Sequence, residues 1–357
     1  MTGAELVRAH VEPRVGRMEQ LAAIRRYAFE DGKARGMRAF EVVNASGFAY
    51  AVYPDKGLDI GPASFNGLPV AWTSRNGAVA PAFYDGTSFE WLRTWSGGLV
   101  TTCGLLNVGG PCATAEGAHG LHGRMHHTPA EEVNTRAFWR TPEDYVLEIA
   151  GTIVHSRVFA ENLVTRRTIV THLGWPGVEV RDRTTNEGSA AMPLMRLYHM
   201  NFGWPLVDEG TRLVAPPHRV VPQNAYCEAH VGDWDRFAAP QPEFREQVFY
   251  HHDVPSGADG LAEVRLVNAR LGIAAAVAWR TDELPYLVQW KMPGAGEYVT
   301  GLEPANCYPE GQEAFANRGL LRRIEPGETV ETCVRVAIIP AGSEGESAKS
   351  ADKGPLT

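Results

Sequence analysis

The chain has 357 residues, of which 44% are hydrophobic and 21% charged, a composition typical of globular proteins. Its formal charge is -8 at pH 7, so no basic excess is available to neutralise nucleic-acid phosphates. The five cysteines are odd in number and form no CxxC pair, which argues against a disulfide framework and a zinc site. There is no uncharged apolar run of about 18 residues that could span a membrane, and the N-terminus lacks the apolar segment of a signal peptide. We therefore expect a soluble cytoplasmic protein.

Short β-branched or aromatic runs, separated by Gly and Pro, dominate the chain. The best helical candidate, residues 4–25, is interrupted by Pro13 and Gly16. The runs that predict strands are, in chain order, 40–43, 49–53, 145–149, 168–171, 178–183, 247–250, 262–267, 273–279, 286–290 and 332–338. Turn signals lie between several of them, at Asn66-Gly67, Asn76-Gly77 and Asp259-Gly260. Many short strands with regular turns predict an all-β sandwich or barrel, and no Gly-rich phosphate loop supports a nucleotide-binding fold.

No linker divides the chain into independent domains. We therefore predict one domain over residues 1–340. The segment 341–357 is small, polar and charged, which predicts a disordered tail.

The first cluster of polar residues is HGLHGRMHHTP, which holds His119, His122, Arg124, His126 and His127. Its glycines argue against a continuous helix. If this stretch is extended, alternation places His122, Arg124 and His126 on one face. That face would offer an imidazole acid beside a guanidinium, an environment that suits the hydroxyls and ring oxygen of a sugar. A surface loop whose histidines bond to backbone groups is the alternative.

The second cluster is RLYHMNFGWP, which contains His199, Asn201 and Trp204. Strand alternation places His199 and Asn201 on one face with Leu197, and three apolar residues on the other: Tyr198, Met200 and Phe202. A polar face next to aromatic rings suits a pyranose, whose C–H faces stack on rings and whose hydroxyls need directional partners. A core histidine bonded to backbone is the alternative.

The third cluster contains QWK and, after a turn, YVTGLEP, with Glu303 at the end of an apolar run. A carboxylate at that position is expected to be partly buried, which would raise its pKa and make it a candidate general base. Gln289 and Lys291 alternate with apolar neighbours on a polar strand face. Lys291 as an ion-pair partner of Glu303 is the alternative.

At these clusters the sequence resembles the aldose 1-epimerase (galactose mutarotase-like) superfamily, and within it a less characterised bacterial branch of unknown function. GLHGR at 120–124 and YHMNFG at 198–203 are similar to its two histidine motifs, and YVTGLEP at 298–304 is similar to its glutamate motif. The branch is indicated by DKGLDIG, GGLVTTCGLLNVG, EQVFYHHD and LPYLVQWKM. The resemblance covers nearly all of the chain up to about residue 340.

The resemblance implies a large antiparallel β-sandwich with an open cleft, a sugar substrate, and neither a cofactor nor a metal. In such enzymes a Glu takes the proton of the anomeric hydroxyl while a His protonates the ring oxygen. The ring opens, the aldehyde rotates, and closure gives the other anomer. Carried over, Glu303 is the base and His199 the acid, and His122 binds substrate or shares the acid role. The residues expected to bind substrate are Asn107, Arg124, His126, Asn201, Glu246, Gln289 and Lys291.

The sequence also departs from the family pattern. The usual arginine motif upstream of the first histidine is missing, and neither Arg75 nor Arg93 aligns with it. Arg124 is not expected in a galactose mutarotase and could indicate an anionic sugar. Glu246 is the candidate for the acidic residue that contacts sugar hydroxyls in typical members.

Two other functions stay open at this point. One is a metal-dependent sugar isomerase or lyase that uses His122, His126, His199 and Glu303. The other is a non-catalytic carbohydrate-binding domain that keeps the cleft. The identity of the sugar and the oligomeric state, with a homodimer as one option, also stay open.

Overall fold

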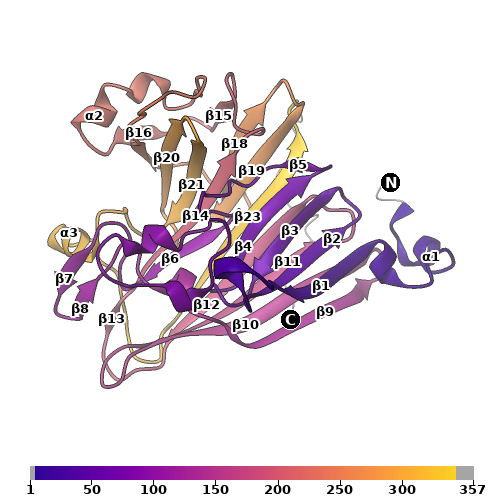
Figure 1. The fold of residues 1–357 in the computed structure, drawn as a ribbon, viewed down its shortest axis with the longest axis horizontal. Helices are drawn as coiled ribbons and strands as arrows, with labels where there is room; N and C mark the ends of the chain where they lie inside the picture. The colour runs from indigo at the N-terminus through magenta and orange to yellow at the C-terminus, as the bar shows by residue number, and fades with distance from the viewer. Residues whose placement is uncertain (1–4, 343–357) are drawn as a thin grey trace.

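Antiparallel sheets form the framework of the computed structural model, which describes residues 5–342 (Figure 1). From residue 343 onward, the segment predicted to be a disordered tail lies outside the described residues. The fold class predicted from the sequence, an all-β antiparallel sandwich, is confirmed.

The helices of the described residues are short and form no layer of their own. The candidate helix over 4–25 does not form: the described part of this segment holds only two short turns, and Ala22 already begins the first strand, paired with Asn44. Pro13 and Gly16 disfavour continuation of that helix. The helical elements of residues 5–342 are α1 Arg8–Val11, η2 Met18–Gln20, η3 Gly32–Ala34, η4 Pro81–Phe83, η5 Glu90–Arg93, η6 Met125–His127, α2 Ala225–Glu228, η7 Val231–Asp233 and α3 Gln312–Asn317.

Within the described residues, three larger sheets carry the fold. The five-stranded N-terminal sheet is β1 Ala22–Ala28, β2 Arg38–Asn44, β3 Phe48–Tyr53, β4 Asp59–Phe65 and β5 Leu68–Pro69. The eight-stranded sheet has the order β15 Arg212–Val214, β18 Leu261–Asn268, β19 Ile273–Arg280, β23 Thr329–Pro340, β12 Gly177–Asn186, β11 Asn162–His172, β10 Asp144–Ser156 and β9 Glu131–Thr141. The six-stranded sheet has the order β16 Arg219–Pro222, β17 Gln247–His252, β20 Tyr286–Gly294, β21 Glu297–Ala305, β14 Met195–Gly203 and β6 Thr101–Leu105.

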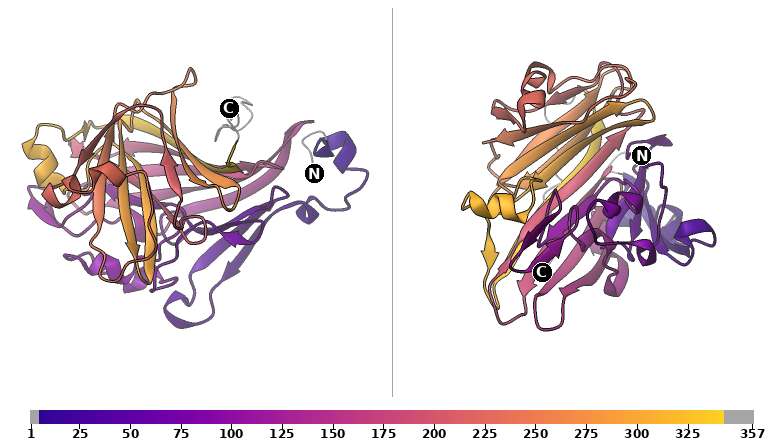
Figure 2. Two further views of the ribbon diagram at one scale, coloured as in Figure 1. Left: turned by 90° about the horizontal axis from the view of Figure 1, so that it is seen from above. Right: turned by 60° about the vertical axis from the view of Figure 1, so that its left-hand side comes forward.

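Two small ribbons complete the described part of the fold: β13 Met192–Pro193 with β22 Arg323–Ile324, and β7 Cys112–Thr114 with β8 Gly117–His119. Figure 2 shows the strands of the sandwich side by side in layers, with the N-terminal strands (indigo to purple) beside β9 and β10. All ten predicted strand segments fall on observed strands. The predicted Asn66-Gly67 turn joins β4 to β5, and both residues have positive φ, at 49° and 81°, as a type I′ hairpin turn requires.

The main hydrophobic core lies between the sheets, because alternate residues of each strand point inward. On β14 the inward residues are Tyr198, Met200 and Phe202, which pack with Ile149 of β10 and Val180 of β12. The opposite face of β14, with Leu197, belongs to a second apolar cluster on the outer side of the six-stranded sheet. The alternation predicted for this strand is therefore confirmed, and it directs His199 outward.

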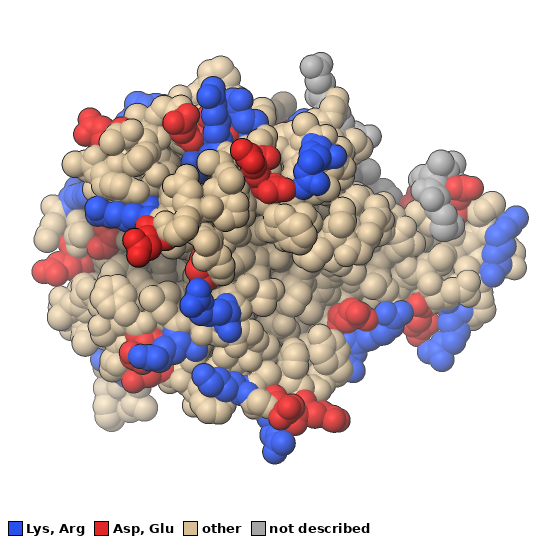
Figure 3. All heavy atoms as spheres, turned by 45° about the horizontal axis from the view of Figure 1, so that its top comes forward, with Lys and Arg blue, Asp and Glu red and all other residues tan. Residues whose placement is uncertain are grey.

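The surface carries mixed charge. Figure 3 shows Lys and Arg side chains interspersed with Asp and Glu on the face in view. No helix within residues 5–342 is both long and apolar enough to cross a membrane.

Candidate active site

The three residues predicted as catalytic line one cavity of about 280 Å³ on the outer face of the six-stranded sheet. His199 comes from β14 and Glu303 from the neighbouring strand β21, while His122 lies in the loop between β8 and η6. Because β14 and β21 are paired in the sheet, residues far apart in the sequence meet on its outer face. The cavity therefore brings together the carboxyl group of Glu303 and the imidazoles of His122 and His199.

Tryptophan rings form much of the wall of this cavity. Trp91 of η5 lies 5.0 Å from the ring of His122, measured between centroids. Trp95 and Trp290 flank His199 at 5.1 and 5.5 Å. Such rings exclude water from the imidazoles and offer faces on which the C–H groups of a sugar ring can stack.

His199 and Glu303 form a close pair at the base of the cavity. Nε2 of His199 lies 3.1 Å from Oε1 of Glu303, and both side chains are almost completely buried. The geometry of these two atoms does not meet that of a hydrogen bond, and Oε1 of Glu303 has no hydrogen-bond partner among the described residues. Nδ1 of His199 likewise has none. Buried polar atoms are nearly always paired in native proteins, so unpartnered ones at a cavity indicate a place for a ligand.

Gly301 keeps the space around this pair open. A Cβ atom at this position would lie 2.4 Å from Oε1 of Glu303 and 3.0 Å from Cε1 of His199. Any larger residue would push the two functional groups out of their present positions. Gly301 also pairs with Trp290 across the sheet, which places the tryptophan next to the pair.

His122 is oriented by the backbone around it. Its φ of 56° lies in the left-handed region, and its Nδ1 accepts a hydrogen bond from the amide of Gly109 at 3.3 Å. An imidazole that accepts at Nδ1 carries its proton on Nε2 when it is neutral. His122 can therefore donate a hydrogen bond from Nε2, and its ring centroid lies 6.0 Å from that of His199.

Burial controls the protonation of all three residues. It lowers the pKa of His122 to about 4 and that of His199 to about 3, because the charged imidazolium loses its hydration. Burial also raises the pKa of Glu303 well above its usual range, and the charge of Glu246 adds to the effect. At neutral pH both imidazoles are therefore neutral, and Glu303 holds a proton far more readily than an exposed carboxyl group does.

Glu246 lies at the rim of the cavity. Its Oε2 accepts a hydrogen bond from Nε1 of Trp290 at 2.8 Å, and the residue itself is exposed. Of the residues predicted to bind substrate, it is the one that lines the cavity together with His199 and Glu303.

Asn107 and Asn201 do not line this cavity. Asn107 is fully buried and bonds only to protein groups, with its Nδ2 donating to the carbonyl of Gly120 and its Oδ1 accepting from the amide of Gln312. Asn201 donates to the carbonyls of Gly98 and His199. Both amides therefore hold the backbone around the site.

Gln289 and Lys291 point to the opposite face of β20. Glu303 pairs with Val288 across the sheet, so Val288 and Trp290 share its face and the alternate residues do not. Lys291 donates to the carbonyls of Asp233 and Arg236. It is therefore not the ion-pair partner of Glu303 that was considered from the sequence.

Arg124 and His126 are separated from His122 by the local backbone. The extended conformation expected for this stretch is wrong, because His122 turns in the left-handed region and Met125–His127 forms the helical turn η6. His126 is buried and bonds through Nδ1 to Asp59 at 2.6 Å. Arg124 lines a different cavity.

Of the four residues considered from the sequence for a metal site, His126 does not line the cavity of the other three. His126 bonds to Asp59, and its ring lies 5.9 Å from that of Trp91. In residues 5–342, no group of three or more His, Cys, Asp or Glu side chains has a geometry that could hold a metal ion.

The sequence reasoning did not identify Trp91 and Trp95 as part of the site. Both lie in the segment FEWLRTWSGG, Trp91 within η5 and Trp95 just after it. This segment shows no strand or helix periodicity. The tryptophan that was singled out, Trp204, is 65% exposed and does not line the cavity. An aromatic pair next to a Gly-Gly step was the only local signal.

Six buried histidines make the stability of the protein sensitive to acid. Their pKa values are lowered chiefly by burial, whereas an unfolded histidine titrates near 6.5. Between about pH 6.5 and 4 the unfolded chain therefore binds protons that the folded chain does not, and the free energy of unfolding falls as pH falls. The six residues are His122, His126, His127, His155, His199 and His251.

We expect the melting temperature, measured by circular dichroism, to be lower at pH 5 than at pH 7.5. Asp59 and Glu303 act in the opposite sense, because burial raises their pKa values, but they are fewer. A melting temperature that stays constant or rises between pH 7.5 and 5 would contradict the neutral state of the buried histidines.

The fold matches solved structures of the galactose mutarotase-like class. A protein from Klebsiella pneumoniae subsp. pneumoniae, provisionally assigned as an aldose 1-epimerase, superposes with a TM-score of 0.84 at 23% identity over 94% of this chain and 91% of that chain. A galactose mutarotase-like protein from Clostridium acetobutylicum gives 0.63 at 13% identity, over 90% and 99%. A galactose 1-epimerase from Lactobacillus acidophilus gives 0.57 at 12% identity, over 90% and 99%. The chain thus has the mutarotase-like β-sandwich fold.

Residues 34–338 match the family described as a domain of unknown function, DUF4432, and the chain belongs to that family. No protein with curated annotation matches the sequence significantly.

Proposed function

We propose that the protein is a cofactor-free carbohydrate epimerase that interconverts the anomers of a sugar. The observation that carries the proposal is the buried His199–Glu303 pair, with unpartnered polar atoms, at the base of a cavity walled by tryptophans and faced by His122. A base and an acid close together can act on the two oxygen atoms attached to one anomeric carbon.

In the proposed reaction, the pair carries a single proton that can reside on either partner. With the proton on His199, Glu303 takes the proton of the anomeric hydroxyl and His199 gives its own to the ring oxygen. The C–O bond of the ring breaks, an aldehyde forms and rotates, and the reverse transfers close the ring as the other anomer. The pair ends with one proton, as it began, so no co-reactant is needed.

Burial favours the form in which the proton lies on Glu303 while the cavity is empty. Sugar hydroxyls in the cavity would supply hydrogen bonds to the charged form, which is the form with ionised Glu303. His122, with its proton on Nε2, would donate to the substrate, and Glu246 at the rim would accept from its hydroxyls.

The test is NMR exchange spectroscopy of anomeric protons on a panel of neutral, acidic and deoxy aldoses and ketoses. We expect at least one sugar to exchange anomers faster in the presence of the protein than in its absence. Saturation-transfer NMR on the same panel separates the alternatives. Binding without faster exchange would indicate a carbohydrate-binding domain instead of an epimerase. If no sugar of the panel either binds or exchanges faster, both the epimerase and the carbohydrate-binding function would be contradicted.

A further inference from the structure

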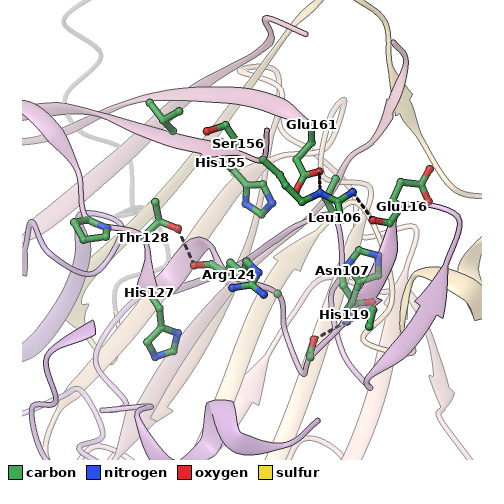
Figure 4. Close-up of a pocket in the computed structure, with 16 residues that line it drawn as sticks. Leu106, Asn107, Glu116, His119, Arg124, His127, Thr128, His155, Ser156 and Glu161 are labelled. Atoms are coloured by element: carbon green, nitrogen blue, oxygen red, sulfur yellow. Dashed lines mark hydrogen bonds and ion pairs between the residues drawn. The ribbon is translucent and has the colours of Figure 1, made fainter. Parts of the chain in front are cut away.

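A second cavity, of about 460 Å³, is lined in part by Gly120, Gly123 and Arg124 of the loop that carries His122, but not by His122 itself. Figure 4 shows this cavity. Arg124, His119 and His155 line it, and neither His199 nor Glu303 does. Figure 4 shows these three side chains directed into the same hollow. The proposed reaction does not use any of them.

Arg124 is the uncompensated charge of this cavity. Its guanidinium forms no hydrogen bond or ion pair with another described residue, although it lies over the ring of Tyr84 at 6.0 Å. It also packs against the backbone at Gly86, where a Cβ atom would come within 2.8 Å of Nη2. Arg124 is an exposed residue, and its guanidinium N–H groups are available to bind an anion in the cavity.

His155 contributes an unused polar group. Its side chain is 6% exposed, and its Nδ1 is buried without a hydrogen-bond partner among the described residues. Burial lowers its pKa to about 4, and the charge of Arg124 acts in the same direction. A neutral imidazole can donate from one nitrogen and accept at the other, which suits a hydroxyl group.

The acidic residues of the cavity are already paired. Glu161 accepts from Arg157 at 3.1 Å, and Glu116 pairs with Arg323 at 3.3 Å. Their presence disfavours a ligand with two or more negative charges, because the second charge would meet these carboxylates. The fork of an arginine matches the two oxygens of a carboxylate.

We propose that this cavity binds a small hydroxy acid, whose carboxylate contacts Arg124 and whose hydroxyls contact His155 and His119. The site is separate from the cavity of His199 and Glu303, so the inference does not depend on the proposed epimerase activity.

Isothermal titration calorimetry with sodium gluconate tests the proposal on the full-length protein. We expect gluconate to bind, and Arg124→Gln to weaken its affinity about 10- to 100-fold, since a charge-assisted hydrogen-bond pair is lost. Arg166→Gln is the matched control, because Arg166 is exposed on β11 and pairs with Glu187 away from the cavity. Glu303→Gln should bind gluconate as the wild type does. Gluconate binding can therefore be tested independently of the proposed epimerase activity.

Inorganic phosphate serves as the second probe and should bind more weakly than gluconate, because its second charge faces Glu116 and Glu161. NMR of ¹⁵N-histidine-labelled protein locates the bound probe. We expect gluconate to shift the imidazole signals of His119 and His155 and to leave those of His122 and His199 in place. Absence of gluconate binding, equal affinity of Arg124→Gln, tighter binding of phosphate, or shifts confined to His122 and His199 would each overturn the proposal.

Discussion

Replacing Glu303 by Gln is expected to slow anomer exchange by about 10²–10⁴-fold, the usual contribution of one general acid–base group. The amide has nearly the shape of the carboxyl group but cannot take a proton from the anomeric hydroxyl. Because Glu303 is fully buried in a low-dielectric cavity, the neutral amide should not cost stability, and the melting temperature should not fall. The measurement is exchange spectroscopy on the most active sugar of the panel.

Glu331→Gln is the control for this variant. Glu331 lies on β23, is exposed, and pairs with Arg183 at the surface, so the same change there should leave exchange at the wild-type rate. Saturation-transfer NMR should show that Glu303→Gln still binds the sugar. A Glu303→Gln protein that exchanges anomers at the wild-type rate would show that another group is the base.

Replacing His199 by Asn is expected to cause a loss of similar size, about 10²–10⁴-fold. The amide of Asn can still donate hydrogen bonds, but it cannot transfer a proton to the ring oxygen. The informative measurement is the double variant with Glu303→Gln. If the two residues share one proton, either single change disables the pair, and the double variant should be only a few-fold slower than the slower single variant.

The double variant distinguishes this model from independent action. Losses that multiply would mean that His199 and Glu303 contribute separately, and the shared-proton model would fail. Trp204→Phe serves as a control for substitution near the end of the same strand, because Trp204 is exposed and lies outside the cavity. It should leave exchange unchanged.

Much of the fold could be predicted from residue patterns alone. Strand segments are local features, because alternation and β-branched content follow from neighbours in the sequence. The two faces of β14 were predicted for the same reason: within a strand, residue parity determines the face. The candidate helix over 4–25 does not form, because Ala22 instead pairs with Asn44 in a sheet, a contact that is non-local.

The site was predictable only in part. The three motifs identified His122, His199 and Glu303, and the structure places these residues in one cavity. The other predicted ligands depended on the assumption that their segments were extended or faced the same way. Lys291 was expected on the face of β20 that carries the site, but it lies on the opposite face. The pairing register of β20 with β21 puts Trp290 on the side of Glu303, and no local pattern reveals that register.

The sequence by itself determined the strands, the placement of His199 on the strand face opposite Tyr198 and Met200, and the three polar residues of the motifs, since these depend on local alternation and residue chemistry. Only the tertiary structure decided which side chains share a cavity. Trp91 and Trp95 reach it from a long irregular segment, and the left-handed turn at His122 sends Arg124 to another cavity. The physical reason is that side chains alternate between two faces only where the backbone is extended. Strand register and loop packing are set by contacts between residues distant in the chain.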